Sequence, residues 1–519
     1  MNQLLITIII IIIITILIIT TYFILNNKKQ KGSSFFLRYD CFNDNPDLFD
    51  KYLECYNHID NLNENELNFM NDIKFQEDNS FNLMLEKINE ELNCISPDQN
   101  KNLYVMGDVH GSVLSVLTPL VQGNLLQHIE NSNDYIQFNY NTNRFIYNPI
   151  LNQSYNNIVV YTGDIVERAY HRHSLALFIM ILQLAKNNDN IKYVIGNHDL
   201  ITILDWNIGL QTFEITEERS YDKENENIKK DVVLEFINYV KQTDELFYYY
   251  NQEYKVLASH TIQYYPKFES YINYQSGEPY SIVRDENKYK LCSTMLSMRY
   301  IELYKNMYDK QEINNYFENS GKSKDKYEKY INDMEELYNI INSGNNFTYE
   351  NLNKILKKCC LLCCNLNRFG YVDLSLKHFQ NPNLKNTHNY ANVYNYNIFD
   401  IMLCILLTVV WTRPPPANTV EYTNNILKIE NIDYDYHIIG HTTHKGHKLS
   451  LTKHENESLI KYIFNDYSDL NVYGDLNSKI TRFDGKKYKV IDIVVDFSNI
   501  YNEYRNNVID IIEKYEDKI

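Results

Sequence analysis

The chain has no excess of positive charge. It carries 50 Lys and Arg against 67 Asp and Glu, which gives a formal net charge of −17 over 519 residues. Proteins that bind nucleic acids neutralise phosphates with clustered Lys and Arg, so we expect no nucleic-acid partner. Hydrophobic residues make up 44% of the chain, which is ample for a buried core.

The sequence also lacks a disulfide framework. Its Cys count of 9 is odd, and "KKCCLLCCN" holds Cys359, Cys360, Cys363 and Cys364. In an oxidising compartment such a cluster would be a liability, so it favours reducing, cytosol-like surroundings. Doubled Cys-x-x-Cys could bind zinc. However, the flanking "LNKILKKCCLLCCNLNRF" has helical periodicity, which favours a buried helix face over a zinc site.

The first residues also lack the features of a cleavable signal peptide. Residues 4–25, "LLITIIIIIIITILIITTYFIL", are uncharged, and no charge precedes Lys28. A signal peptide would have a basic start, a shorter apolar run and a small-residue cleavage site. About 20 apolar residues cross a bilayer as a helix. Residues 1–27 are therefore predicted to be a transmembrane anchor.

Basic residues follow this apolar segment, which sets the expected orientation. Cytosolic flanks carry the excess of Lys and Arg, so the large domain of this single-pass protein is expected in the cytosol. Asn, Ile, Lys and Tyr, whose codons are AT-rich, are abundant. An AT-rich protist or a large DNA virus would be a natural source, and for a virus the expected membrane is a viral or host membrane. The basic residues are Lys28, Lys29, Lys31 and Arg38.

The rest of the chain divides by composition. Residues 28–100 are acidic and polar and are expected to be a linker and a helical region, with "LMLEKINEELN" its most amphipathic piece. Residues 101–270 and 399–519 are predicted to form one core in two parts, separated by a mostly helical insertion at 271–398. Within the second part, "FDIMLCILLTVV" at 399–410 is too short to span a membrane and is expected to be a core strand or helix.

Five apolar runs are typical of buried strands, and each ends in polar residues. They are "NLYVMGDVHG", "NIVVYTGDIVER", "IKYVIGNHDL", "YKVLASHTI" and "YHIIGHTTH". Helical stretches separate them, which indicates a sheet buried on both faces with functional sites at the carboxyl ends of strands. The strand-end residues that could carry chemistry are Asp108, His110, Asp164, Asn197, His198, His260 and His441.

These side chains suggest a metal centre. One Asp-x-His, such as Asp108 and His110, could merely end a buried strand. A repeated supply of carboxylates and imidazoles with one amide forms an oxygen and nitrogen ligand set for divalent ions. Two ions that share a carboxylate can activate water for in-line attack on phosphorus. The five clusters, each after an apolar run, indicate such a centre.

The motifs resemble a known family. "GDVHG", "GDIVER", "GNHD" and "GHT" are similar to the signatures of calcineurin-like metallophosphoesterases, and most closely to the bacterial-like phosphoprotein phosphatase (Ser/Thr) branch. That branch has GD-x-HG, GD-x-VDRG and GNHE. The resemblance covers roughly residues 101–270 and 405–500. It implies an α/β fold in which a two-sheet β-sandwich is flanked by helices, with two divalent ions (Mn²⁺, Fe²⁺/³⁺ or Zn²⁺) at the strand ends.

The resemblance also implies which residues hold the metals. "ASHTI" lacks the glycine pair that usually follows its histidine, so His260 is the least secure ligand. Asp164 would bridge the two ions. The first ion would be bound by Asp108, His110 and Asp164, and the second by Asp164, Asn197, His260 and His441.

Four further residues would act on the substrate by the same resemblance. His198 would be the general acid, and Glu167, where the family usually has Asp, would orient it. Arg168 would hold the phosphate. Arg413 in "VVWTRPPP" would be a second phosphate clamp, or else a surface arginine before a stiff turn. Asp199 replaces the usual Glu of GNHE, which is a mild change.

Three functions remain open at this point. The first is a membrane-anchored dinuclear-metal phosphatase for phosphomonoesters, with phosphoserine or phosphothreonine in a protein partner as substrate. The second is a hydrolase of small phosphoanhydrides such as dinucleoside polyphosphates. The third is a catalytically impaired metallophosphoesterase-fold scaffold that binds partners at the membrane. The intact set of strand-end residues argues against the scaffold, because a decayed site usually loses its ligands first.

Overall fold

The computed structural model divides the chain into two compact units. One comprises Met1–Gln76 and Asn502–Ile519, and the other comprises Glu77–Tyr501. The structure describes residues 62–150, 157–166, 173–208, 226–261, 301, 304–305, 308–319, 324–343, 348–366, 402, 405–406, 409–410, 432–441, 448–451, 460–464, 469–470, 475–485, 487–515 and 518.

Helix α4 (Glu64–Asn93) confirms that the acidic N-terminal region is helical where it is described. It begins with a capping box. The Asn63 side-chain oxygen accepts from the backbone N–H of Asn65 and of Glu66, at 2.9 and 3.0 Å. The Glu66 carboxylate in turn accepts from the Asn63 N–H at 2.9 Å. These bonds satisfy N–H groups that have no partner within the helix.

In the first unit, the start of α4 pairs with the end of α19 (Ser498–Tyr515). The rings of Phe69 and Tyr515 lie 5.5 Å apart. Lys514 forms an ion pair of 2.8 Å with Asp72. Exposed pairs of this kind contribute little, so apolar contacts contribute more to the association than the ion pair.

The larger sheet of the second unit has six strands, in the order β12-β13-β1-β5-β6, with β14 also paired to β13. Strands β1, β5 and β6 are parallel, and β13 runs antiparallel to β1. The bounds are β1 (Leu103–Met106), β5 (Ile158–Tyr161), β6 (Ile191–Tyr193), β12 (Asp469–Leu470), β13 (Asp475–Asp484) and β14 (Lys487–Asp496).

The second sheet has five strands, in the order β10-β11-β9-β8-β7. Strand β9 is parallel to both β8 and β11. All five predicted strands are therefore confirmed. They divide between two sheets, as the family resemblance implied and the apolar pattern alone did not, since β1, β5 and β6 lie in the first sheet and β8 and β9 in the second. The bounds are β7 (Tyr248–Asn251), β8 (Val256–Ser259), β9 (Tyr436–Ile439), β10 (Lys448–Leu451) and β11 (Ile460–Phe464).

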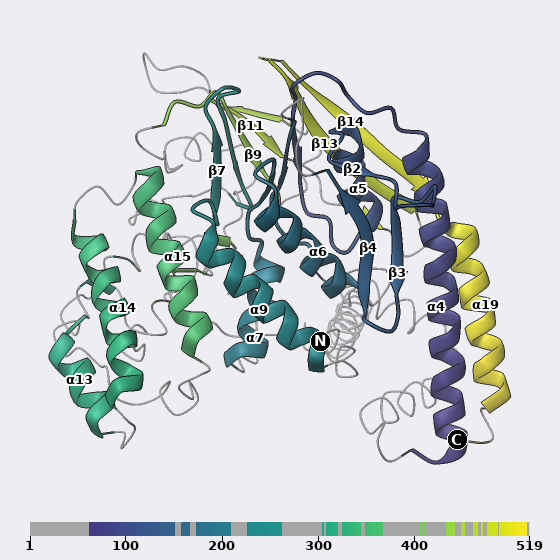
Figure 1. Ribbon diagram of the computed structural model, residues 1–519, viewed down its shortest axis with the longest axis horizontal. Helices are drawn as coiled ribbons and strands as arrows, with labels where there is room; N and C mark the ends of the chain where they lie inside the picture. Colours follow the sequence, from purple (N-terminus) through teal and green to yellow (C-terminus); the bar gives the residue numbers. More distant parts are fainter. Residues whose placement is uncertain are drawn as a thin grey trace, which may run out of the picture. The chain divides into compact units, whose positions relative to one another are not determined.

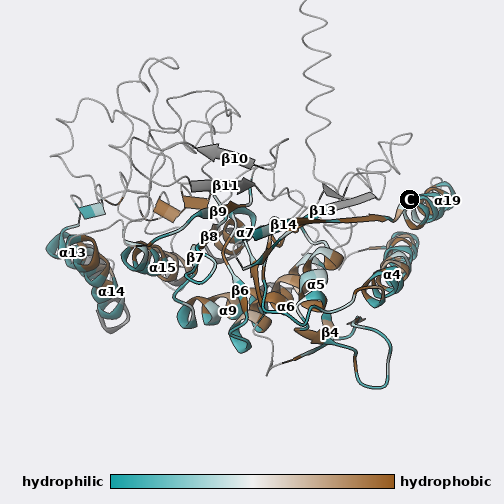
Figure 2. Ribbon diagram, turned by 90° about the horizontal axis from the view of Figure 1, so that it is seen from above, coloured by the Kyte–Doolittle hydropathy of each residue, from teal (hydrophilic) through white to brown (hydrophobic). Residues whose placement is uncertain are grey.

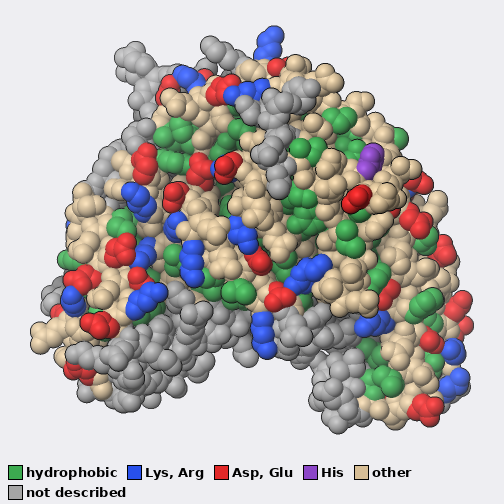
Figure 3. All heavy atoms as spheres, viewed as in Figure 1, with side chains coloured by type: hydrophobic (Ala, Val, Ile, Leu, Met, Phe, Trp, Pro, Cys, Tyr) green, Lys and Arg blue, Asp and Glu red, His purple; other side chains and the backbone are tan. Residues whose placement is uncertain are grey.

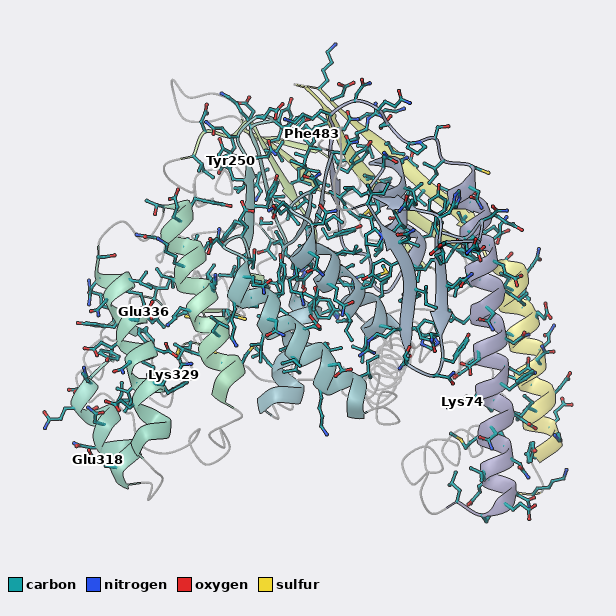
Figure 4. All side chains as sticks on the ribbon, viewed as in Figure 1. Lys74, Tyr250, Glu318, Lys329, Glu336 and Phe483 are labelled. Atoms are coloured by element: carbon teal, nitrogen blue, oxygen red, sulfur yellow. The ribbon has the colours of Figure 1, made fainter. Side chains whose placement is uncertain are left out.

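A common apolar cluster joins the two sheets. Val105 and Val160 of the first sheet belong to the same buried cluster as Ala258 and Ile438 of the second. Phe483 of β13, labelled in Figure 4, closes this cluster, and its ring lies 5.3 Å from that of Tyr436. Alternate residues of a strand point to opposite faces, so each sheet turns its other face to the helices.

Helices cover those other faces. Tyr104, Tyr161 and Tyr193 alternate with the residues of the sandwich interior and pack with the apolar residues of the helices. Helices α5, α6 and α9 lie along one side of the strands (Figures 1 and 2). This arrangement confirms the expected mixed α/β fold. The helix bounds are α5 (Val113–Gln122), α6 (Ser174–Asn187), α7 (Asn197–Ile208) and α9 (Glu226–Gln242).

A three-stranded sheet, β2-β4-β3, lies beside these helices. Its strand β4 packs against α6. The side chain of Asn89 on α4 ties it down, since its amide donates to the Ile136 carbonyl at 2.9 Å and accepts from the Tyr135 N–H at 2.8 Å. The bounds are β2 (Leu126–Gln127), β3 (Ile136–Asn139) and β4 (Arg144–Pro149).

The region predicted as an insertion is helical where it is described. Helix α15 packs against α14 and also against α7 and α9 of the core. Lys358 of α15 forms ion pairs with Asp333 and Glu336 of α14, at 2.7 and 2.6 Å. Glu336 is labelled in Figure 4. The bounds are α13 (Lys310–Asn319), α14 (Lys324–Asn342) and α15 (Tyr349–Leu366).

The four clustered cysteines are core residues of α15. All four side chains are buried, and burial raises the pKa of the Cys359 thiol above its ordinary value. Among the described residues, the groups that could hold a metal ion contain no cysteine. These facts favour the helix-core interpretation over zinc.

The apolar run at 399–410 is helical at each described position. Its described residues are helical and buried, which decides between the strand and helix alternatives in favour of the helix. They are Met402, Ile405, Leu406, Val409 and Val410.

No helix within the described ranges is long and apolar enough to cross a membrane. The anchor predicted at residues 4–25 lies outside those ranges.

Candidate metal centre

Five loops bring the predicted strand-end residues together. They follow β1, β5 and β6 of the six-stranded sheet and β8 and β9 of the five-stranded sheet. The seven side chains are buried although all are polar or charged, which costs free energy unless they are paired or bind a cation. They are Asp108 and His110 after β1, Asp164 after β5, Asn197 and His198 after β6, His260 after β8 and His441 after β9.

The backbone is strained at three of these positions. His110, Asp164 and His441 have positive φ angles of 42°, 50° and 59°. Residues other than glycine rarely adopt this region, and such strain gathers at functional sites. Each of these residues turns the chain sharply after a strand, so its side chain stays at the strand end.

Motif glycines allow two carboxylates to enter. A Cβ atom on Gly196 would lie 2.3 Å from Asp164 Oδ1, and a Cβ atom on Gly440 would lie 2.3 Å from Asp108 Oδ1. Any larger residue would displace these carboxylates. The space left by Gly440 also lets the next residue, His441, donate its backbone N–H to both Asp108 oxygens at 2.8 Å.

Two groups of three side chains could each hold a metal ion. Asp108, His110 and Asp164 form one, and Asp164, His260 and His441 form the other. Within each group the possible ligand atoms all lie within 4.8 Å of one another, and every member is buried. Asp164 belongs to both groups, so its carboxylate could be shared by ions held at the two groups.

The surroundings of His260 fit a cation. Its Nδ1 lies 2.7 Å from the Thr162 carbonyl oxygen, which can only accept, so Nδ1 carries the proton. Nε2 lies 2.9 Å from Asn197 Oδ1 and 3.4 Å from Asp164 Oδ1. A histidine that binds a metal is unprotonated at the ligating nitrogen, and with Nε2 in that form three acceptor atoms converge, which is favourable around a positive ion. The donor set therefore fits a divalent metal, and the doubt raised by the "ASHTI" sequence is not supported by geometry.

His198 lies beside the two groups without belonging to either. Its backbone N–H donates to Asp164 Oδ1 at 2.9 Å. Its Nε2 lies 3.9 Å from Asp164 Oδ2, and its ring meets that of His110 edge to face at 5.1 Å. This is a suitable place for a proton donor that is not a metal ligand.

Asp199 has a role that the sequence did not reveal. Its Oδ1 accepts from the backbone N–H of Ile165 and Val166, at 2.8 and 3.1 Å. Its Oδ2 accepts from the Tyr193 hydroxyl at 2.7 Å and from the Gly196 N–H at 3.2 Å. Burial, and then the charge of Asp164, raise the pKa of Asp199, while these donors oppose the rise. The only sequence signal for this role was the position of Asp199 itself, at the end of the GNHD motif.

Three predicted residues, Glu167, Arg168 and Arg413, lie outside the described ranges. The structure nevertheless describes hydrogen bonds of residues that precede them in the chain. The Val166 N–H, directly before Glu167, is bound by Asp199. The Thr261 hydroxyl, next to His260, donates to the carbonyl oxygen of Val409.

A comparison with family models agrees with this geometry. The model of the calcineurin-like phosphoesterases matches residues 101–445, which span all seven strand-end residues. No curated protein matches the chain. The family match covers well over half of the sequence, and the buried Asp and His groups are those that a metal-dependent hydrolase needs. The chain therefore belongs to the calcineurin-like phosphoesterase family and is a metal-dependent phosphoesterase.

Proposed function

We propose that the protein is a membrane-anchored dinuclear-metal phosphatase for phosphomonoesters, and that its substrates are phosphoserine and phosphothreonine in proteins. The position of Asp164 in both groups of possible ligands carries this proposal. A carboxylate shared by two adjacent groups can bridge two ions, as a dinuclear phosphoesterase requires.

The ligands divide between the two ions around Asp164. Oxygen and imidazole nitrogen donors suit Mn²⁺, Fe²⁺/³⁺ and Zn²⁺. The convergent acceptors at His260 support a second ion, because Asn197 Oδ1 and Asp164 Oδ1 face the same ring nitrogen. We assign the first ion to Asp108, His110 and Asp164, and the second to Asp164, Asn197, His260 and His441.

The remaining residues act on the substrate. Bound divalent ions supply Lewis-acid polarisation of phosphoryl oxygens and lower the pKa of water. His198, held at the site by its N–H bond to Asp164, gives a proton to the leaving oxygen. Glu167 orients His198, and Arg168 holds the phosphate by paired N–H bonds. Arg168 follows a segment that Asp199 anchors at Val166.

Arg413 is proposed as a second phosphate clamp. The bond from Thr261 to the Val409 carbonyl supports it, because Thr261 follows His260 and Val409 comes shortly before "WTR". Both ends of this link are buried. The chain that leads to Arg413 therefore starts next to a proposed metal ligand.

Hydrolysis assays of the full-length protein in detergent micelles with Mn²⁺ test the proposed substrate class. We expect turnover of p-nitrophenyl phosphate and a phosphoserine or phosphothreonine peptide, with the peptide preferred over a dinucleoside polyphosphate by kcat/KM. The reverse preference would favour the phosphoanhydride hydrolase. Two bound ions without turnover of any substrate would favour the scaffold.

Partners and location follow from charge and from residues 4–25. On the face shown in Figure 3, Lys and Arg are interspersed with Asp and Glu, and the described residues form no broad basic patch there. This supports phosphorylated partners over nucleic acid. The anchor at residues 4–25, followed by four basic residues, supports a cytosolic large domain.

Protease treatment of sealed microsomes tests this orientation. We expect the large domain to be digested while the vesicles are intact, because it faces the outside of a microsome. Full protection would contradict the orientation, as would glycan on Asn152, Asn346 or Asn456, each of which stands in an Asn-x-Ser/Thr sequence.

A further inference from the structure

The buried carboxylate of Asp199 joins two segments of the metal centre. Two of its bonds go to the N–H groups of Ile165 and Val166, directly after Asp164. A third goes to the N–H of Gly196, directly before Asn197. Asp199 therefore holds the loop after β5 against the start of α7, and with them two of the proposed ligands.

Tyr193 determines the orientation of that carboxylate. Its hydroxyl donates to Asp199 Oδ2 at 2.7 Å, the shortest of the four bonds. The ring is fully buried, with the rings of Phe178 and Tyr239 each 5.6 Å away. The Tyr239 hydroxyl donates to the Tyr193 carbonyl at 2.6 Å, which holds the backbone as well. The hydroxyl of Tyr193 thus approaches Asp199 from a rigid part of the core.

We propose that Tyr193 and Asp199 are a pair of positioning residues that set the distance between Asp164 and Asn197, and hence the affinity of the metal centre. This inference rests on the proposed dinuclear site. Neither residue contacts the substrate. They act through the backbone N–H groups of Ile165, Val166 and Gly196, which carry the ligands with them.

The chemistry explains why both members matter. A carboxylate that accepts four bonds at two oxygens cannot be replaced by an amide, because the amide nitrogen is a donor and would face other donors. Without the Tyr193 hydroxyl, Asp199 Oδ2 keeps only its longer bond to Gly196. Partners that orient metal ligands indirectly are typically worth about 10- to 100-fold in metal affinity.

The test measures Mn²⁺ binding to the full-length metal-free protein, by titration followed by electron paramagnetic resonance. Tyr193→Phe removes one hydroxyl and keeps every charge. Tyr161→Phe is its matched control, because Tyr161 lies on the neighbouring strand, is equally buried and donates its hydroxyl to the Val116 carbonyl at 2.6 Å. Asp199→Asn completes the set.

We expect Tyr193→Phe to weaken Mn²⁺ binding about 10-fold and Asp199→Asn up to about 100-fold. In both variants the signal of two spin-coupled Mn²⁺ ions should be weaker than in the wild type. Tyr161→Phe should lower thermal stability to a similar extent and leave Mn²⁺ affinity within about twofold of the wild type, because its hydroxyl bonds only to α5.

Equal Mn²⁺ affinity in Tyr193→Phe, Tyr161→Phe and the wild type would overturn the inference, since Tyr193 would then be a packing residue only. A loss confined to Asp199→Asn would also overturn it, because charge rather than position would be the cause. A wild-type protein that binds none of Mn²⁺, Fe²⁺ and Zn²⁺ would contradict the proposed function itself, and the inference with it.

Discussion

At the scale of single residues, His198 is the side chain whose role differs most from that of its neighbours. It lies 3.9 Å from the shared carboxylate of Asp164 but belongs to neither group of ligands. Replacing it by alanine should keep both metals and slow turnover about 10²- to 10⁴-fold, the usual range for losing a general acid. Metal analysis and steady-state kinetics measure the two effects.

The leaving group provides the control for this prediction. p-Nitrophenol is acidic and needs little protonation, so His198→Ala should lose less on p-nitrophenyl phosphate than on a phosphoserine peptide. Asp164→Asn should instead lose metal as well as rate on every substrate, because Asp164 belongs to both ligand groups. A metal-free His198→Ala protein, or an equal loss on both substrates, would show that His198 is not the acid.

The sequence was most informative about residues that follow buried strands. Two features of the sequence together predicted that the strand-end residues meet at one site. These are the spacing of the motifs and the expectation that parallel strands bring their carboxyl ends to the same edge. The hydrogen bonds of Asp199 could not be predicted. Its partners, which include Ile165 and Tyr193, depend on how separate segments of the chain come together in the fold. Hydrogen bonds to backbone N–H groups do not depend on residue type, so they produce no pattern in the sequence. In the sequence, Asp199 is visible only as a mild change from the GNHE motif.

His437 makes stability depend on pH. It is buried in β9, next to the ring of Tyr434, and burial lowers the pKa of His437 to about 3. Its Nε2 lies 2.7 Å from the Ser259 hydroxyl, which donates to the Thr261 carbonyl at 2.7 Å. The neutral ring therefore donates its Nε2–H to the Ser259 hydroxyl, and this bond stabilises the turn at His260.

The sign of the effect follows from the lowered pKa. Above the ordinary pKa of histidine, about 6.5, neither the folded nor the unfolded state is protonated and the contribution is complete. As pH falls toward 3, only the unfolded state takes up the proton, so stability is lost, by about 2 kcal/mol at pH 5. His437→Gln keeps a donor but does not titrate. Urea unfolding of the metal-free proteins should show a smaller loss from pH 7 to 5 in the variant, and equal losses would contradict the assignment.

At the scale of elements, α15 closes an open sheet edge. β7 is the last strand of the five-stranded sheet, and Asn353 of α15 binds its backbone. The Asn353 oxygen accepts from the N–H of Phe247 and Tyr248, both at 3.3 Å, and its amide donates to the Tyr248 carbonyl at 3.2 Å. Tyr349 accepts from the Tyr250 N–H at 3.3 Å. An uncovered edge would invite pairing with another chain.

Asn353→Ala should therefore destabilise the fold by about 3 kcal/mol, because it leaves buried backbone groups without their partners. Urea unfolding measures the loss, and light scattering should show earlier aggregation. Lys354→Ala, at the next and exposed position of α15, is the control and should change stability by less than about 0.5 kcal/mol. Similar losses in both variants would mean that helix propensity, rather than the covered edge, is responsible.

The elements that could be predicted from sequence are those with a simple apolar pattern. β1 and β8 are fully buried apolar runs, β5 is buried except for its half-buried first residue, and the described residues of 399–410 are all helical and buried. The hairpin of β13 and β14 escaped prediction because β14 mixes exposed, half-buried and buried residues, and charged residues interrupt its apolar pattern. The division into two sheets came only from the family resemblance, since the apolar patterns of parallel strands in both sheets look alike.

At the scale of the whole phosphoesterase core, the metal centre lies at the seam between the two sheets. Asp108 and Asp164 come from the ends of β1 and β5, whereas His260 and His441 come from β8 and β9 of the other sheet. Asp108 Oδ1 and Asp164 Oδ1 lie 3.5 and 3.4 Å from the ring nitrogens of His260. Two buried carboxylates so close together repel each other unless a cation compensates them. Divalent ions bound here would therefore join the sheets as well as serve the reaction.

Metal removal should then destabilise the core as a unit. An ion that binds only the folded state at about 100 times its Kd stabilises it by about 2.7 kcal/mol, so a chelator should lower Tm by a few degrees and excess Mn²⁺ should restore it. The dependence should disappear in Asp164→Asn, which lacks the shared carboxylate, and persist in His198→Ala, which keeps both ligand groups. Hydrogen exchange should quicken on chelation at the ends of β1, β5, β8 and β9 together, because the ions link both sheets. If only one sheet responds, or if Tm is unchanged while two ions are shown to bind, the metals do not join the sheets and serve the reaction alone.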